Sequence, residues 1–471
     1  MSNPPLEHPS DSLLAKKVAL VLFHNDLRVD DNATLGKAAE IAGGDNGRLM
    51  LVYAPFLMDV VEKKTKSQAY HYDNMGHARL QFLAETLADL NESLEQLGNR
   101  LLHLQERLPL ALDTFAQLCQ LIEQQYVTDI CVSQTADYNQ NQAYDILQRK
   151  YPQVRWHMQS TATLFDSLPL DGLPKSFTQF RKKIESDYDL LNVENDIILC
   201  QKPKSLPPMP ESMISKSGYF FESQNFNERT VAVTDASVGT TYPSPHKFKG
   251  GESSGLNHLD TYFDSSSPST YKTTRNTLDN WADSTKLSAW LANGSLSVNT
   301  LLNRLRHYER DTIANESTYW IWFELLWREY FYWYAVTHCQ KLFTFQGIAP
   351  QSPSTRFDKK LLEQWKNGET PYPIVNACIN QLKSTGYMSN RGRQLTASCF
   401  IHELGLDWRY GATYFEQHLI DYDVASNWGN WQYLAGVGAD PRGCRQFNLK
   451  KQTQQYDPNG DFINKWQGKV G

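Results

Sequence analysis

The 471-residue sequence lacks features that mark several common classes of protein. No two of its cysteines are spaced as CxxC, which argues against a zinc knuckle or a redox motif. Their wide spacing also argues against a disulfide framework and indicates reduced thiols in the cytoplasm. No run of about 18 uncharged apolar residues occurs, so we expect no transmembrane helix. The cysteines lie at positions 119, 131, 200, 339, 378, 399 and 444.

The sequence also has no excess of positive charge. The net charge is −6, which weighs against nucleic-acid binding by the chain as a whole. Its distribution is uneven, because residues 1–267 carry 24 Lys and Arg against 34 Asp and Glu, whereas residues 268–471 carry 22 against 18. A basic binding face is therefore expected only in the second part. Residues 1–16 are polar, so we expect a flexible start and not a signal peptide.

Aromatic residues, in contrast, are abundant: the sequence has 12 Trp, 24 Tyr and 21 Phe. Aromatic side chains beyond the needs of core packing indicate a ring-shaped ligand, unstacked bases or a path for electrons.

The first 160 residues alternate short apolar runs with helical patterns, of which residues 75–97 give the clearest helix. This alternation predicts an α/β domain over residues 17–160, with a doubly wound, parallel five-stranded sheet that binds ligands at the carboxyl ends of its strands. No GxGxxG motif follows the first strand, which runs into a polar turn with a helix N-cap expected near Asp31. The predicted strands are Val18–Phe23, Leu49–Tyr53, Leu101–Leu104, Asp129–Val132 and Val154–Met158.

Residues 161–267 are predicted to form a connector, rich in Pro, Ser and Gly after residue 200, with one short helix at residues 251–263. Residues 268–471 show almost only helical patterns and predict a second, all-helical domain. The predicted helices are Thr285–Leu291, Val298–Asn315, Tyr319–His338, Leu361–Gln364, Ile374–Thr385, Arg393–Glu403 and Ala412–Leu419.

Residues 421–438, DYDVASNWGNWQYLAGVG, combine two carboxylates, an amide, three large aromatics and three glycines. Each glycine inside a helix costs about 1 kcal/mol relative to alanine. We interpret the glycines as room for a flat heterocycle pressed against the backbone. A buried aromatic cluster beside a turn is the alternative.

This segment resembles the flavin pocket of the photolyase/cryptochrome family, and SNWGNWQYLAGVGADPR is similar to its DASH branch. Three more motifs carry the resemblance, in the family's order. HNDLRVDDN at residues 24–32 resembles the RNDLR turn of the N-terminal domain, with His24 in place of Arg. ELLWRE at residues 324–329 resembles the ExxWRE helix, although an exposed Glu–Arg ion pair would explain it too. GYMSNRGRQ at residues 386–394 resembles the DASH motif GFMSNRGRQ.

The resemblance implies FAD in the helical domain. The segment STKLS at residues 284–288 offers hydroxyls, a lysine and free N–H groups at a helix start, which suits a phosphate. It resembles the family's TSRLS clamp, although an ordinary N-cap is the alternative. The FAD-binding residues implied are Tyr271, Ser284, Thr285, Lys286, Leu287, Ser288, Trp327, Arg328, Arg393, Asp421, Asp423 and Asn427, with Arg393 paired to Asp421.

The resemblance also implies blue-light repair of cyclobutane pyrimidine dimers in DNA by electron transfer from reduced FAD. Glu324 and Asn390 would act on the lesion, and Trp431 and Trp408 would deliver electrons, with Thr355 where a third tryptophan is expected. The residues that would face DNA are Glu324, Trp327, Arg328, Tyr387, Asn390, Arg391 and Tyr433.

Tyr387 and Tyr433 stand where enzymes that repair duplexes have Trp, and weaker stacking favours single-stranded DNA as the substrate. Ser389, where enzymes for the (6-4) lesion have His, disfavours that reaction. A 5,10-methenyltetrahydrofolate antenna is left open, because Asn141 replaces the acid expected to hold it. We expect a monomer without membrane contact. A signalling photoreceptor and a dark electron-transfer flavoprotein are the alternatives, and the short C-terminus weighs against the first.

Overall fold

Five parallel strands form one sheet in the order β3-β2-β1-β4-β5 in the computed structural model. The prediction of a five-stranded parallel sheet is confirmed, and every predicted strand lies within one residue of the observed bounds. The strands are β1 (Val18–Phe23), β2 (Arg48–Tyr53), β3 (Leu101–His103), β4 (Asp129–Ser133) and β5 (Arg155–Gln159). The structure describes residues 17–44, 46–54, 75–104, 114–188, 196–214, 220–221, 248–439 and 445–468.

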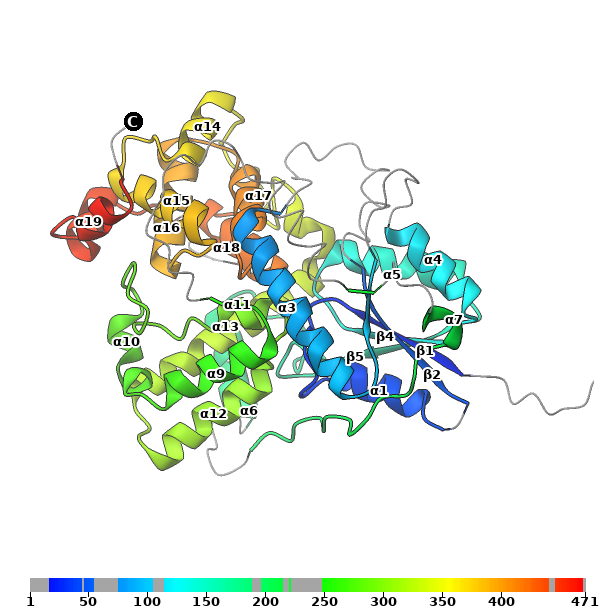
Figure 1. The fold of residues 1–471 in the computed structure, drawn as a ribbon. Helices are drawn as coiled ribbons and strands as arrows, with labels where there is room; N and C mark the ends of the chain where they lie inside the picture. Colours follow the sequence, from blue (N-terminus) through cyan, green and yellow to red (C-terminus); the bar gives the residue numbers. More distant parts are fainter. Residues whose placement is uncertain are drawn as a thin grey trace, which may run out of the picture.

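Helices cover both faces of the sheet (Figure 1), as expected for a parallel sheet whose strands are buried on both sides. Alternate residues of β1 point to opposite faces: Leu20 packs in the core with α4 (Thr114–Gln124) and α5 (Tyr138–Lys150). Val21 packs in the core with α1 (Ala33–Ile41) and α3 (His77–Gln96). Two separate hydrophobic cores therefore enclose the sheet.

The turn after β1 joins the sheet to the helical half. Its N-cap is Asn32, which accepts from the Leu35 N–H at 2.9 Å, one residue later than expected, because Asp31 has a positive φ of 46°. The Arg28 guanidinium is buried and donates to the backbone carbonyls of Gly294, at 2.9 Å, and Thr161, at 2.8 Å. The turn predicted as a motif of the N-terminal domain is thus a clasp between three parts of the chain.

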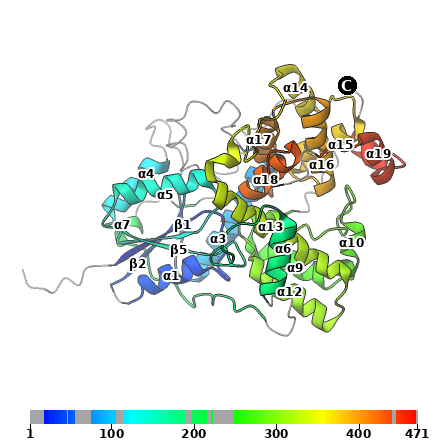
Figure 2. The ribbon, with the colours of Figure 1, turned by 180° about the vertical axis from the view of Figure 1, so that it is seen from behind.

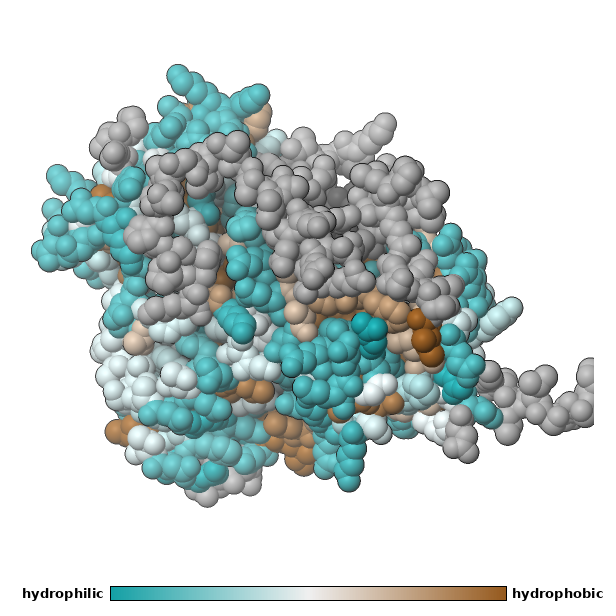
Figure 3. All heavy atoms as spheres, in the orientation of Figure 1, coloured by the Kyte–Doolittle hydropathy of each residue, from teal (hydrophilic) through white to brown (hydrophobic). Residues whose placement is uncertain are grey.

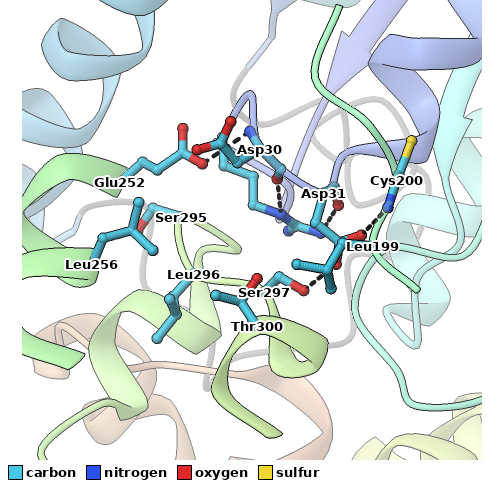
Figure 4. Close-up of a pocket in the computed structure, with 11 residues that line it drawn as sticks. Asp30, Asp31, Leu199, Cys200, Glu252, Leu256, Ser295, Leu296, Ser297 and Thr300 are labelled. Carbon is cyan, nitrogen blue, oxygen red and sulfur yellow. Dashed lines mark hydrogen bonds between the residues drawn. The ribbon is translucent and has the colours of Figure 1, made fainter. Parts of the chain in front are cut away.

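Figure 4 shows a pocket beside this clasp, lined by residues of the turn, of the connector and of the helical half. Glu252 accepts from the N–H groups of Val29, at 2.8 Å, and Asp30, at 3.0 Å. Asp31 accepts from the Cys200 N–H at 2.7 Å and from the Ser297 hydroxyl. The carboxylates of this pocket are therefore occupied in holding the clasp closed.

The second half is helical, as predicted (Figures 1 and 2). The connector carries α6 (Phe177–Asp187), α7 (Glu211–Ile214) and α9 (Glu252–Phe263), the last at the predicted place. The helices that follow are α10 (Tyr271–Thr274), α11 (Ser288–Ala292), α12 (Val298–Asp311), α13 (Glu316–His338), α14 (Lys359–Asn367), α15 (Pro373–Thr385), α16 (Asn390–Ser398), α17 (Trp408–His418), α18 (Val424–Ala435), α19 (Leu449–Tyr456) and α20 (Asp461–Lys465).

Several predicted helix bounds need correction. Helix α17 begins at Trp408, four residues before the predicted Ala412, α13 begins at Glu316 instead of Tyr319, and α14 spans Lys359–Asn367 instead of Leu361–Gln364. The helix predicted from residue 285 begins at Ser288, because Lys286 has a left-handed φ of 56° that a helix cannot contain. The helix predicted to reach Asn315 ends at Asp311, since Asn315 is the N-cap of α13 and forms a capping box with Thr318. The helix predicted over residues 393–403 divides into α16 and a π-helical turn at 399–403.

Helix α3 of the sheet half also packs on the helical half, against α17, and Figure 1 shows it between the two. The Gly76 N–H donates to the Gln417 carbonyl at 2.8 Å, and Arg79 lies 4.6 Å from the centre of the Tyr422 ring. A Cβ at Gly386 would lie 2.8 Å from Ala78, so the two halves approach each other closely here.

The face in Figure 3 is largely hydrophilic, with hydrophobic side chains in separate small patches. Within the described ranges, no helix has the length and apolar character needed to cross a membrane. The same ranges contain no group of three or more His, Cys, Asp or Glu side chains that could hold a metal ion.

Candidate functional site

The predicted site residues come from six places in the helical half: α10, the start of α11, α13, the α15–α16 turn with α16, α17, and α18 with the residues just before it. The strongest link among them is made by Asp421, which precedes α18. Arg393 on α16 donates from one nitrogen to both carboxylate oxygens of Asp421, at 2.7 and 2.9 Å. The Ser288 hydroxyl donates to the same carboxylate at 2.7 Å. The implied Arg393–Asp421 pair is therefore formed, and it ties three helices together.

Lys286 gives the start of α11 the character of an anion site. Its side chain is 7% exposed, and Nζ donates to the Ser284 hydroxyl at 2.9 Å and lies 5.1 Å from the centre of the Tyr387 ring. No carboxylate among the described residues pairs with it. No side-chain cap satisfies the first N–H groups of α11. A buried ammonium without an acid favours a bound anion, which fits the diphosphate of FAD.

The backbone of Lys286 supports this interpretation. A left-handed conformation at a residue other than glycine costs about 1–3 kcal/mol and is concentrated at ligand sites. Thr285 and Leu287 flank it; the Thr285 carbonyl lies 2.8 Å from the His258 ring nitrogen, and Leu287 is buried. These two residues therefore contribute backbone and packing, not charge.

Asp423 and Asn427 are used partly by the protein itself. Asp423 caps α18 by accepting from the Ser426 N–H at 2.7 Å. Asn427 is buried and donates to the Ala412 carbonyl at 3.0 Å, while no described residue donates to its side-chain oxygen. One oxygen of each side chain thus has capacity for a ligand that donates hydrogen bonds.

The glycines of α18 do not have the role that we inferred from the sequence. A Cβ at Gly429 would lie 2.4 Å from the Phe331 ring, and one at Gly438 would lie 2.8 Å from Gln432. Gly436 ends α18 in the left-handed conformation, with φ of 72°. The interpretation as room for a heterocycle is wrong, because close helix packing and a helix C-cap require these glycines.

Glu324 on α13 is ion-paired with Arg275 of the α10 end. Burial raises the pKa of Glu324, and the charge of Arg275 opposes this rise. The Arg275 guanidinium lies 4.7 Å from the centre of the Trp320 ring. Tyr271 is buried, and burial raises the pKa of its hydroxyl well above the usual range. Glu324 is therefore part of a charged cluster. Its side chain is 30% exposed and can contact a ligand.

Trp327 lies one turn along α13, where rings surround it. Phe177 of α6 stacks on it with 3.8 Å between ring centres and 13° between planes. Phe331 lies 5.4 Å away, and Tyr433 lies edge to face at 6.1 Å. The Arg445 guanidinium lies 4.8 Å from the Tyr433 ring centre. Only the uncovered part of the half-buried Trp327 ring is left to contact a base.

Arg328 points to the connector. It donates to the Ala162 carbonyl at 2.5 Å and to the Leu291 carbonyl at 3.4 Å. With His24 and Asp423 it lines a small cavity between the carboxyl end of the sheet and the helical half. Burial lowers the pKa of His24, and the charges of Asp137 and Asp26 oppose this shift.

The residues of the α15–α16 turn point in different directions. Asn390 is exposed, and Tyr387 is covered by Lys286 and, at 5.5 Å, by the Arg393 guanidinium. Arg391 instead faces the C-terminal segment, with its guanidinium 4.7 Å from the Tyr456 ring centre. The structure therefore brings Tyr387 to Lys286 and Arg393 but places Arg391 in a separate cluster.

Trp431 and Trp408 are both buried, but no ring contact joins them among the described residues. Trp431 packs against Phe400, at 5.6 Å, and Trp365, at 6.4 Å. Thr355 adjoins Arg356, whose backbone pairs with Leu406 just before Trp408. The site expected for a third tryptophan thus lies near Trp408, and the Thr355 hydroxyl there is buried without a partner.

Phe177 and Trp320 are the neighbours of the site that sequence reasoning did not single out. Trp320 was detectable, because it lies one helical turn from Glu324 on α13. Phe177 was not, since 150 positions separate it from Trp327 and nothing in the connector pattern marks it.

Asn141, which replaces the acid expected to hold an antenna, lies in the sheet half, where its side chain donates to the Thr135 carbonyl at 3.0 Å.

Comparisons with known proteins agree with this architecture. The family described as DNA photolyase matches residues 19–206, and the FAD binding domain of DNA photolyase matches residues 320–470, which supports FAD as the cofactor. The chain is 46% identical to Cryptochrome DASH of Idiomarina loihiensis, over 96% of this chain and 93% of that protein. It is also 46% identical to Cryptochrome DASH of Vibrio parahaemolyticus, over 97% and 94%.

Solved structures give the same result. The crystal structure of a Synechocystis cryptochrome superposes with a TM-score of 0.77 and 32% identity, over 96% of this chain and 88% of that one. A class III photolyase from Agrobacterium tumefaciens gives a TM-score of 0.75 and 25% identity, over 98% and 88%. The similarity thus extends over both halves of the chain.

Proposed function

Because this chain belongs to the photolyase/cryptochrome family, in its DASH cryptochrome branch, we propose that it repairs cyclobutane pyrimidine dimers in single-stranded DNA under blue light. Reduced FAD, when bound, supplies the electron that splits the dimer. The remaining steps of binding and orientation belong to residues of the helical half.

Lys286 and the uncapped start of α11 would hold the diphosphate of FAD. The Arg393–Asp421 pair places a guanidinium beside the same region, where its positive charge favours a reduced, anionic ring system. Asp423 and Asn427 each keep an oxygen that can accept a hydrogen bond from the ring edge. The cations Lys286 and Arg393 thus suit the negative charge of a flavin nucleotide, and the acceptors Asp423 and Asn427 suit the N–H groups of its ring.

The observation that carries the repair proposal is the surface of α13. Glu324 and Trp327 lie one turn apart on it, and Tyr433 of α18 lies against Trp327. Burial raises the pKa of Glu324 against the opposing charge of Arg275, so a base that replaces Arg275 beside the carboxyl group would favour its neutral form, which can donate to a base carbonyl. Contact of an aromatic ring with a base is worth about 1–3 kcal/mol, which helps to hold an extruded dimer.

The preference for single strands rests on Tyr387 and Tyr433. A phenol ring offers less stacking area than an indole, so extraction of a dimer from a duplex is harder to offset. In a single strand the bases are already unstacked. We expect contact with DNA by Asn390, which is exposed at the start of α16, and by Arg445 beside Tyr433.

Repair is tested with purified, flavin-loaded protein under reducing conditions. An oligonucleotide with one thymine dimer, either single-stranded or annealed, is illuminated with blue light or kept dark, and intact dimer is counted by chromatography. We expect loss of dimer only in the light and faster in the single strand. Glu324→Gln should slow repair, whereas Glu363→Gln on exposed α14 should not.

Persistence of the dimer in the illuminated single strand would exclude repair. If flavin photoreduction remained normal in that sample, a signalling photoreceptor would be the better description. The absorption spectrum of the same preparation tests for an antenna, because a bound folate adds a near-ultraviolet band to that of the flavin.

A further inference from the structure

Phe177 is closer to Trp327 than the other aromatic neighbours of that tryptophan among the described residues. The two ring centres are 3.8 Å apart and the planes are within 13° of parallel. Tyr330 and Tyr433 meet Trp327 edge to face, and Phe331 lies closer to parallel but farther away, at 5.4 Å and 27°. Phe177 is 4% exposed, so the pair covers one face of the Trp327 ring with a fixed, dry surface.

Phe177 is fixed because α6 is bound firmly to α13. Phe180 is fully buried and packs on Tyr330, with 5.4 Å between ring centres. The Tyr319 hydroxyl donates to Glu185 at 2.8 Å and accepts from Arg181. Figure 2 shows α6 alongside α13 in the helical half, although it belongs to the connector.

We propose that Phe177 is a positioning residue for lesion recognition, through its stacking on Trp327. This inference rests on the proposed function, because it assigns Phe177 a part in binding the same dimer. The stacked ring holds Trp327 in one orientation before DNA arrives and closes one of its faces. A base can then contact only the remaining part of the ring, on the side where Tyr433 lies.

The expected effect follows from the cost of ordering a side chain. Immobilising a side chain on binding costs about 0.5–1.5 kcal/mol, and a ring that is already immobile avoids that cost. Loss of the Phe177 ring should therefore weaken binding of a dimer about 3- to 10-fold. Undamaged DNA does not insert a base against Trp327, so its affinity should be unchanged.

Phe177→Leu is the test variant, and Phe180→Leu is the matched control. Both remove one buried ring from α6 where it packs on α13, but only Phe177 touches Trp327. Flavin-loaded proteins are titrated in the dark with two fluorescent single-stranded oligonucleotides, one with a single thymine dimer and one undamaged. Melting temperatures of the variants show whether the two substitutions cost similar stability.

We expect Phe177→Leu to bind the dimer 3- to 10-fold more weakly and the undamaged strand as the wild type does, while Phe180→Leu binds both normally. At saturating substrate the repair rate of Phe177→Leu should equal that of the wild type, because the chemistry is unaffected and only KM rises. In a Trp327→Phe background the effect of Phe177→Leu should shrink, since the two substitutions remove one interaction.

If Phe177→Leu and Phe180→Leu lost the same affinity for the dimer, the Phe177 ring would only support the core, and the inference would be wrong. Wild-type affinity in Phe177→Leu would also overturn it. A wild type that does not discriminate the dimer at all would remove the proposed function and this inference with it. Discrimination by the wild type that persists unchanged in Phe177→Leu would remove the inference alone.

Discussion

Glu329 makes the stability of the fold depend on pH in a direction that can be worked out from its surroundings. Its carboxyl group is 1% exposed on α13 and accepts from the Trp333 indole N–H at 2.8 Å and from the Leu164 N–H at 3.1 Å. Burial nevertheless dominates and raises its pKa from 4.5 to about 7. The folded chain therefore retains a proton on Glu329 over a range in which the unfolded chain has lost it.

The raised pKa of Glu329 makes the folded state less stable as pH rises. Between pH 4.5 and about 7 the folded state binds more protons than the unfolded state, so stability falls as pH rises. Each unit of pKa difference corresponds to about 1.4 kcal/mol, which makes the contribution of Glu329 about 3 kcal/mol. It is fully present below pH 4.5 and is lost as pH rises through 7. Glu252, whose pKa burial also raises to about 7, contributes a slope of the same sign.

Comparison with Glu329→Gln isolates this one group, because the amide does not titrate and all other groups cancel. The free energy of unfolding of both proteins is measured in urea by circular dichroism from pH 4 to pH 8. We expect the wild type to lose about 3 kcal/mol more than the variant over this range. Glu363→Gln, an exposed control, should keep the wild-type slope. Parallel curves for wild type and Glu329→Gln would refute the reasoning.

Three further substitutions test other parts of the structure. Arg393→Leu leaves the carboxylate it pairs with buried and unpaired, and should cost about 3–5 kcal/mol in urea unfolding and release flavin on gel filtration. Thr355→Trp removes a buried, unpartnered hydroxyl and adds an oxidisable ring, and should speed the bleaching of flavin absorption in blue light; an unchanged rate would contradict the expected electron route. Gly411→Ala brings a Cβ within 2.2 Å of the Trp431 ring and should cost about 1–3 kcal/mol in thermal unfolding. Gly36→Ala, where the nearest atom is 3.4 Å away, should cost nothing.

The sequence was most informative where a pattern is local. Alternation of apolar strands and amphipathic helices located every strand of the sheet. For β1 to β4 the reason is burial on both faces, which requires continuous apolar runs, whereas β5 is an edge strand that is partly exposed. The family resemblance also led to the prediction that Arg393 pairs with Asp421, and this pair is formed although the two residues belong to different motifs and different helices.

The sequence failed where a role depends on a distant partner. The glycines of α18 were read as ligand space, but Gly429 is required by Phe331, a residue of another helix. Arg28 looked like part of a charged loop, yet its guanidinium is buried against carbonyls 133 and 266 positions away. The family resemblance led us to expect Arg391 to face DNA, but its guanidinium lies against the rings of Phe447 and Tyr456 in the C-terminal segment, which no local pattern indicates.

The clasp at Arg28 limits how this protein can be taken apart. Separate expression of the sheet half would leave a desolvated guanidinium without the Gly294 carbonyl, and α3 without α17 beneath its first turn. The helical half alone would in turn lack Ala78, which fills the space beside Gly386 at the start of the α15–α16 turn. A chimaera that joins this helical half to the sheet half of another protein should therefore fold only when that sheet half carries an arginine at the position of Arg28 and an α3 that can pack on α17.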